Sequence, residues 1–138
     1  MADVTCTAAD VRPLPGAITV RMEAAAAIDV GAPVYVSANG EVSEADGSGV
    51  ATAAAIGVLV SVCDGAASST AAADGDAVDV CIYGPVTGYS TNMAGGTYFY
   101  VDDDAGVIAD ASGTKGCIIG IGLNGTTLLV RPQVIDLS

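Results

Sequence analysis

Residues 79–83 read Asp79-Val80-Cys81-Ile82-Tyr83, and residues 18–22 read Ile18-Thr19-Val20-Arg21-Met22. In both stretches apolar and polar side chains partly alternate, which is the pattern of a strand that buries one face and exposes the other. Similar short runs, rich in β-branched or aromatic residues and bounded by Gly, Asn, Asp or Pro, recur along the chain. The strands that we expect span 17–22, 33–37, 56–63, 77–83, 97–101, 117–123 and 126–131. The sequence therefore predicts an all-β fold.

Two Asn-Gly pairs lie between expected strands. Asn39-Gly40 precedes Glu41-Val42-Ser43, and Asn124-Gly125 precedes the strand at 126–131. Asn and Gly both tolerate a positive φ, which the two-residue type I′ hairpin turn requires. We therefore expect a hairpin with a two-residue turn at each pair.

A weak internal repeat is visible when residues 31–36 are laid beside residues 95–100, so that Val34 falls beside Tyr98. A polar turn, a short strand and a loop follow each segment, and then comes a Gly-containing apolar run at 56–60 or 119–123. Two such three-strand units suit a compact small β-barrel or a two-sheet sandwich, which also limits exposed strand edges. The alternative is chance similarity between stretches of simple Gly, Ala and Val sequence.

The first 15 residues differ from the rest. Residues 11–16 read Val11-Arg12-Pro13-Leu14-Pro15-Gly16, and two prolines so close together oppose both helix and regular ladder pairing. We therefore expect an extended N-terminal arm over residues 1–15 and a single domain over residues 16–138. The arm either reaches a neighbouring protomer or is a frayed terminus.

The charge balance excludes one large class of partners. Sixteen acidic residues face only Arg12, Arg21, Lys115 and Arg131, which gives a net charge of −12. A nucleic acid or an anionic membrane would repel such a chain, because both are bound through Lys and Arg. Much of the 51% apolar content is Ala, with one Phe and no Trp, so large core side chains are scarce. That shortage favours an oligomer over a self-sufficient monomer.

The residues offer little catalytic equipment. No histidine is present, so the side chain best suited to proton transfer near neutral pH is missing. Cys6, Cys63, Cys81 and Cys117 form no C-x-x-C pair, and we expect free and mostly buried thiols, with a disulfide as the alternative. The run 102–104 suggests a calcium loop, but its spacing does not fit an EF-hand, and a solvated acidic hairpin tip is expected instead. We expect no enzyme activity, no cofactor, no metal and no small-molecule substrate.

Residues 31–36, 75–80 and 97–108 form three blocks, and the strands at 119–122 and 127–132 close the sequence pattern. These blocks and closing strands resemble those of the small capsid decoration (cement) proteins of tailed bacteriophages. The resemblance implies a β-barrel that forms a homotrimer on the outer surface of the phage head and bridges neighbouring major capsid subunits. It also implies synthesis in the host cytoplasm, and it carries over no catalytic residues.

The surface that would contact the capsid or a neighbouring protomer is expected in the arm and on the strands near residues 98 and 131. The candidate contact residues are Val11, Arg12, Pro13, Leu14, Pro15, Tyr98, Tyr100 and Arg131. Two alternatives remain open. One is a fibre or receptor- or glycan-binding module of a phage or surface layer, and the other is an enzyme that works through carboxylates alone.

Overall fold

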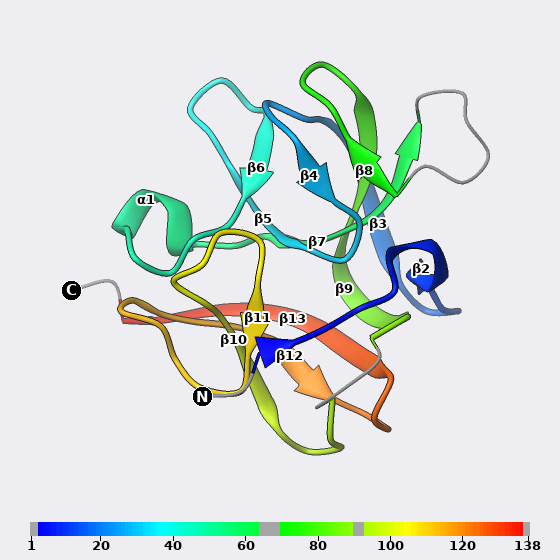
Figure 1. The fold of residues 1–138 in the computed structure, drawn as a ribbon, viewed down its shortest axis with the longest axis vertical. Coiled ribbons are helices and arrows are strands. Elements are labelled where there is room, and N and C mark those ends of the chain that lie inside the picture. The colour runs from blue at the N-terminus through cyan, green and yellow to red at the C-terminus, as the bar shows by residue number, and fades with distance from the viewer. Residues whose placement is uncertain (1–2, 64–69, 90–92, 137–138) are drawn as a thin grey trace.

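The computed structural model describes residues 3–63, 70–89 and 93–136, and it confirms the all-β prediction (Figure 1). Within these ranges, one short helix, α1 (Val50–Ala53), and one 3₁₀ turn, η1 (Ala8–Asp10), accompany the strands. The strands are β1 (Asp3–Val4), β2 (Arg12–Pro13), β3 (Ile18–Glu23), β4 (Ile28–Asp29), β5 (Pro33–Val36), β6 (Val42–Glu44), β7 (Gly57–Cys63), β8 (Ala71–Ala72), β9 (Ala77–Thr87), β10 (Tyr98–Val101), β11 (Ile108–Ala109), β12 (Gly116–Gly122) and β13 (Thr127–Asp136).

The strands form one large curled antiparallel sheet, a half-barrel, and one small second sheet. The order in the large sheet is β1-β11-β10-β12-β13-β9-β7-β5-β6, with β2 and β3 also paired to β9. Strands β4 and β8 make the second sheet. The core inside the curl consists mostly of Val and Ala, and Phe99 is its largest fully buried side chain.

The internal repeat corresponds to two units of three strands that pair in the same order. Strand β5 lies between β6 and β7, and β10 lies between β11 and β12; β7 then pairs with β9, and β12 pairs with β13. The two units meet where β9 pairs with β13. Val34 pairs with Gly57, and Phe99 pairs with Gly120. Val34 therefore corresponds to Phe99 and not to Tyr98, so the alignment made from the sequence is wrong by one residue in this strand.

Gly57 and Gly120 occupy equivalent places in the two units, where neighbouring backbones approach closely. A Cβ atom at Gly57 would lie 2.0 Å from the carbonyl oxygen of Cys81, and one at Gly120 would lie 2.1 Å from that of Leu129. Real Cβ atoms do not come so close to a backbone atom. Each unit therefore needs glycine at this position for its third strand to pair with the strand that follows.

Both predicted hairpins are present, but the two-residue turns are wrong. The Ser37 amide donates to the Glu41 carbonyl (2.7 Å), which leaves three residues in the first turn, with Gly40 at φ 81°. In the second, the Leu123 amide donates to the Thr127 carbonyl (2.9 Å). Asn124 Oδ1 accepts from the amides of Thr126 and Thr127 at 3.2 and 3.0 Å. Asn124 thus acts as a side-chain cap, and the glycine after it takes the positive φ.

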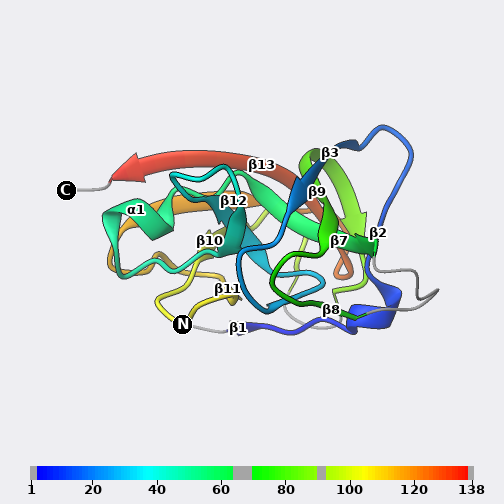
Figure 2. The ribbon, with the colours of Figure 1, turned by 90° about the horizontal axis from the view of Figure 1, so that it is seen from above.

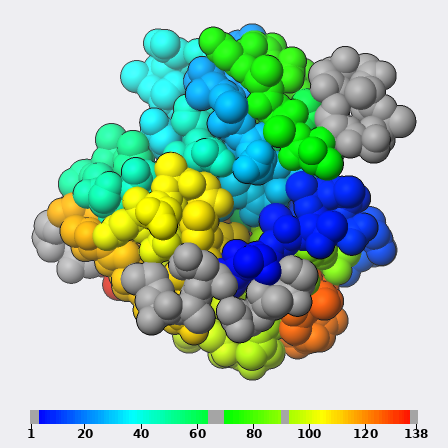
Figure 3. All heavy atoms as spheres, viewed as in Figure 1, coloured from blue at the N-terminus to red at the C-terminus, as the bar shows by residue number. Residues whose placement is uncertain are grey.

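The N-terminal segment lies along its own chain over its described residues, 3–15. Strand β1 pairs with β11, the Thr7 amide donates to the Gly88 carbonyl (3.0 Å), and β2 pairs with the end of β9. The blue residues of this segment lie against the yellow β10–β11 region in Figure 3, and Figure 2 shows β1 on the side of the molecule opposite to β13. This segment closes the open edge of the half-barrel at β11.

Candidate contact face

One face of the half-barrel carries a row of partly exposed apolar side chains. Tyr98 on β10 pairs with Ile121 on β12, which pairs with Leu129 on β13, which pairs with Pro85 on β9. Directly paired residues of antiparallel strands project to the same side of a sheet. The row therefore crosses four neighbouring strands, roughly 14 Å at the usual strand spacing.

Alternation along the strands adds two more residues to this side. In β10, Phe99 and Val101 are fully buried while Tyr98 is 46% exposed and Tyr100 is half-buried. In β13, Arg131 is exposed and follows Leu129 by two residues, so both project to the same side. We name these six residues the contact face: Tyr98, Tyr100, Ile121, Leu129, Arg131 and Pro85.

The contact face carries no carboxylate, although the chain has 16 acidic residues. Its only charge is Arg131, and its other members are aromatic or aliphatic. A partner that covers this face would bury apolar area without stranding a carboxylate away from water, which is the costly step in forming an interface.

The residues that the sequence predicted as contacts lie in three places: on the contact face, on β2 and the loop after it, and in the core. Tyr98, Tyr100 and Arg131 lie on the contact face, whereas Arg12 and Pro13 are exposed on β2. Leu14 is half-buried and Pro15 is exposed, in the loop after β2. Val11 is only 7% exposed and packs in the core of its own chain. Ile121, Leu129 and Pro85 were missed, because only the cross-strand register, which a sequence does not display, brings them beside Tyr98.

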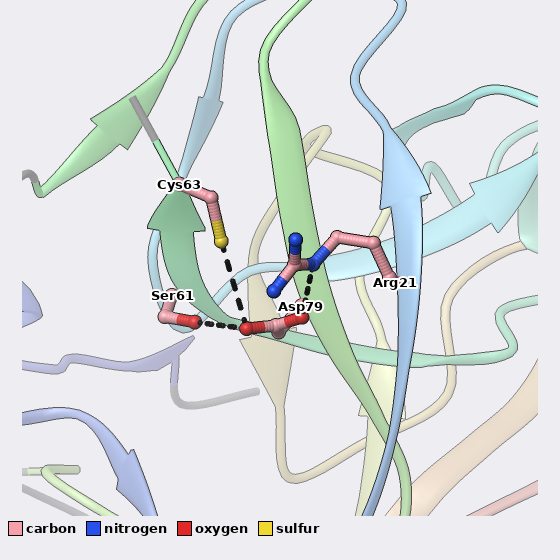
Figure 4. Close-up of polar contacts among 4 residues, drawn as sticks. All are labelled: Arg21, Ser61, Cys63 and Asp79. Atoms are coloured by element: carbon pink, nitrogen blue, oxygen red, sulfur yellow. Dashed lines mark hydrogen bonds and ion pairs between the residues drawn. The ribbon is translucent and has the colours of Figure 1, made fainter. Parts of the chain in front are cut away.

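A polar network holds the edge strand β3 to its neighbours (Figure 4). Arg21 Nε donates to Asp79 Oδ1 at 2.7 Å, and Ser61 Oγ donates to Asp79 Oδ2 at 2.9 Å. The Cys63 thiol approaches the same oxygen at 3.7 Å. The Arg21 hydrogen bond is the main reason that the pKa of Asp79 lies below its usual value. The network joins β3, β7 and β9, and its Ser and Asp have no histidine with which to form a nucleophilic triad.

The acidic residues do not assemble a metal centre among the described residues, where no group of three or more His, Cys, Asp or Glu could hold an ion. The 102–104 run does turn between β10 and β11, and the expected solvated acidic tip holds for Asp103 and Asp104, which are exposed, but not for Asp102, which is buried at 6% exposure. Asp103 accepts hydrogen bonds from the amide and hydroxyl of Thr114, at 2.7 and 2.6 Å, and these bonds lower its pKa.

One pair of carboxylates bears on the idea of an enzyme that works through carboxylates. A side-chain hydrogen bond with Glu23 raises the pKa of Glu41, with smaller contributions from burial and from the charges of Glu23 and Asp74. The two residues meet where β3 ends and β6 begins, beside the bridge between Ala24 and Val42. Glu23 lies on the exposed surface, and neither Glu23 nor Glu41 lines the cleft around Thr7 and Thr126 or the smaller cavity around Val4 and Ile108. The two carboxylates therefore form a surface contact outside both of these hollows.

The four cysteines are free, and two of them are buried. Cys81 and Cys117 lie in the core, and burial raises the pKa of both thiols. Cys6 and Cys63 are exposed, so the expectation of mostly buried thiols holds for only half of them.

The chain matches no protein-family model, and no curated protein matches its sequence significantly. Within the described part of the chain, no helix has the length and apolar character required to cross a bilayer.

Proposed function

We propose that this protein is a capsid decoration (cement) protein of a tailed bacteriophage. It binds the outer surface of the phage head and stabilises the contacts between major capsid subunits, and it has no catalytic role. The observation that supports this most directly is the contact face, an apolar and aromatic sheet surface free of carboxylates on a chain of net charge −12. The sequence blocks that resemble decoration proteins support it independently.

The contact face has the composition of a protein-binding surface. Tyrosine and arginine are enriched among the residues that dominate binding energy at interfaces, and both occur here with partly exposed Ile and Leu. The side chains stand on paired strands of one sheet, so little conformational freedom is lost when a partner covers them. The major capsid protein is the partner that we propose for this face.

Stabilisation of the shell follows from mass action. A protein that binds the assembled shell but not its separated subunits shifts the equilibrium toward the shell. Because a head repeats the same site many times, modest affinity at each site is sufficient, and a homotrimer that engages several subunits at once adds avidity. The acidic remainder of the surface faces away from the packaged DNA, as its charge requires.

Co-sedimentation with purified expanded heads tests the proposal. Tyr98→Asp places a carboxylate on the contact face, and Val50→Asp on α1 is the matched control, because these side chains are 46% and 52% exposed. We expect the wild-type protein and Val50→Asp to pellet with heads and Tyr98→Asp to lose at least about tenfold in affinity, since a buried unpaired charge costs several kcal/mol.

Two results would contradict the proposal. One is a wild-type protein that stays in the supernatant with expanded heads at every concentration tested. The other is mass spectrometry of purified virions that fails to find the protein. Equal binding by Tyr98→Asp and wild type would retain the decoration role but remove the contact face from it.

A further inference from the structure

A polar cleft lies between the N-terminal segment and the end of β9. Its volume is about 450 Å³, and its lining includes Thr7, Asp10, Arg12, Thr87, Gly88 and Thr126. Small-molecule sites usually occupy roughly 300–1,000 Å³, so the cleft is large enough for a ligand. It is open to solvent, and it shares no residue with the contact face.

Backbone contacts hold the walls of the cleft in place. The Thr7 amide donates to the Gly88 carbonyl at 3.0 Å, and the Tyr89 amide donates to the Thr126 carbonyl at 3.1 Å. Gly88 has φ 110°, and a Cβ there would lie 2.5 Å from the Cα of Val11. Glycine is therefore required where the N-terminal segment crosses β9. Because its walls are already fixed, the cleft would lose little entropy when it binds a ligand.

Four polar side chains in the cleft, those of Thr7, Asp10, Arg12 and Thr87, are available for hydrogen bonds to a ligand. Asp10 and Arg12 are exposed, and the ion pair between Arg21 and Asp79 involves neither of them. Thr7 makes no capping bond to η1. The Thr127 hydroxyl donates to the Thr87 hydroxyl at 3.4 Å, so the proton of Thr87 remains free to donate. The Thr126 hydroxyl donates to Asn124 Oδ1 at 3.2 Å and can only accept from a ligand. The cleft thus presents a guanidinium donor, a carboxylate acceptor and two hydroxyls, of Thr7 and Thr87, that can do both.

The side chains that line the cleft indicate which charge and which functional groups a ligand would have. One positive and one negative side chain balance each other, and the net charge of −12 disfavours an anion. A single carboxylate provides too few oxygens for a divalent cation. What remains is a neutral molecule with several hydroxyl groups that donate and accept. We propose that the cleft binds a neutral sugar residue, either as a free sugar or within a surface polysaccharide.

This inference goes beyond the decoration role and does not depend on it. Figure 2 shows η1, which supplies Asp10, on the side of the molecule opposite to β13, which supplies Leu129 and Arg131 of the contact face. Thr87 follows Pro85 by two residues on β9, so one end of the cleft adjoins the contact face. A protein docked through the contact face would leave the Asp10 end of the cleft facing solvent, where it could hold a glycan.

Amide chemical shifts of the full chain test the proposal. The probes are glucose, galactose and N-acetylglucosamine, with N-acetylneuraminic acid as the anionic comparison. We expect at least one neutral sugar to shift the amides of Thr7, Asp10 and Gly88 with a dissociation constant on the order of 1–10 mM, since the contacts are few and wet. Thr7→Val and Asp10→Asn keep the size of each side chain and should each weaken binding at least about threefold. The control is Thr19→Val on β3, an exposed threonine outside the cleft, which should bind as wild type does.

Three outcomes would overturn the proposal: no shift of the cleft amides with any neutral sugar up to about 100 mM, tighter binding of the anionic sugar than of all neutral ones, or equal weakening by the control. None of these outcomes bears on binding to phage heads, so the two proposals can fail separately.

Discussion

Tyr89 links three separate parts of the chain. It is 2% exposed, and its hydroxyl donates to the Gly31 carbonyl at 2.9 Å. Its backbone forms a bridge with Cys6, so one residue joins the N-terminal segment, the turn before β5 and the end of β9. Burial, with smaller effects from Cys6 and Cys81, raises the pKa of its phenol far above the ordinary value, so the hydroxyl stays a donor.

Replacing this hydroxyl should destabilise the protein measurably. In Tyr89→Phe the Gly31 carbonyl loses its buried donor, and we expect the free energy of unfolding to fall by about 1–2 kcal/mol. Urea denaturation followed by circular dichroism measures the change. Tyr98→Phe removes a hydroxyl from a side chain that is 46% exposed and should leave the free energy unchanged. An equal loss in both variants would show that the hydrogen bond to Gly31 contributes nothing specific.

Asp79 should give the protein a stability that depends on pH. Its pKa is lowered in the folded state, chiefly by the Arg21 hydrogen bond. The folded state therefore stabilises the ionised carboxylate of Asp79 more than the unfolded state does. This contribution is complete above the unfolded pKa of an aspartate, about 4, and it is lost as pH falls through the lower folded pKa. Its size is modest, because Arg21 is largely exposed to solvent.

Asp79→Asn should therefore lower the urea midpoint at neutral pH, and the difference from wild type should shrink as the pH falls through the lowered folded pKa and the wild-type carboxylate becomes protonated as well. The control is Asp104→Asn, an exposed residue in the β10–β11 turn, which should not change the midpoint at neutral pH. A difference between Asp79→Asn and wild type that widens as the pH falls would contradict this account.

At the level of elements, the close approach of backbones at Gly57 and Gly120 fixes how each three-strand unit joins the next strand. A side chain at either place would push β7 away from β9 or β12 away from β13, because the atom in the way is a backbone carbonyl oxygen. The pairing of these strands holds the half-barrel together, and the pairing of β12 with β13 sets the spacing of Ile121 and Leu129 on the contact face.

Gly120→Ala should cost roughly 3 kcal/mol of unfolding free energy, because the backbone must shift to admit the methyl group. Gly49→Ala is the control, since a Cβ there meets only the rotatable Thr52 hydroxyl, 2.9 Å away, and we expect its effect to stay within about 1 kcal/mol. Thermal unfolding of both variants measures the difference. Equal melting temperatures for Gly120→Ala and wild type would mean that the two strands can separate without cost.

The sequence predicted the long strands because their pattern is local. Every expected strand lies within two residues of a real one at its start, since alternation and bounding Gly or Asn depend on neighbouring residues alone. Two strand ends were wrong. β9 continues through Gly84-Pro85 to Thr87, and β13 continues through Pro132 to Asp136, because partner strands hold the chain extended where local propensity would end it.

The full set of contact-face residues could not be predicted from local sequence patterns, because strand pairing brings these residues together. Tyr98 and Arg131 stood out as an aromatic and a cation, but Pro85 joins them only through the pairing of β13 with β9. The register that brings Leu129 opposite both Ile121 and Pro85 depends on two partner strands at once. The cleft was missed for the same reason, because it joins residues near positions 10, 88 and 126.

At the level of the whole molecule, the net charge of −12 would oppose the proposed self-association. Each copy carries −12, so a trimer brings three strongly acidic bodies together, and their repulsion acts over the Debye length, about 10 Å at 0.1 M salt. The apolar contacts of an interface lie at van der Waals distance and are hardly screened. Added salt should therefore weaken the repulsion between copies and leave the attraction intact.

The proposed trimer should accordingly form more readily as NaCl rises from about 0.02 M to about 0.5 M, which sedimentation velocity can measure. Replacing Glu23, Asp74 and Asp104, all exposed, by their amides changes the net charge from −12 to −9 and should move the association toward lower salt. If association instead weakened with salt, ion pairs between copies would dominate the interface. A chain with only four cations can form few such pairs, so the direction of the salt effect distinguishes an apolar interface from an ionic one.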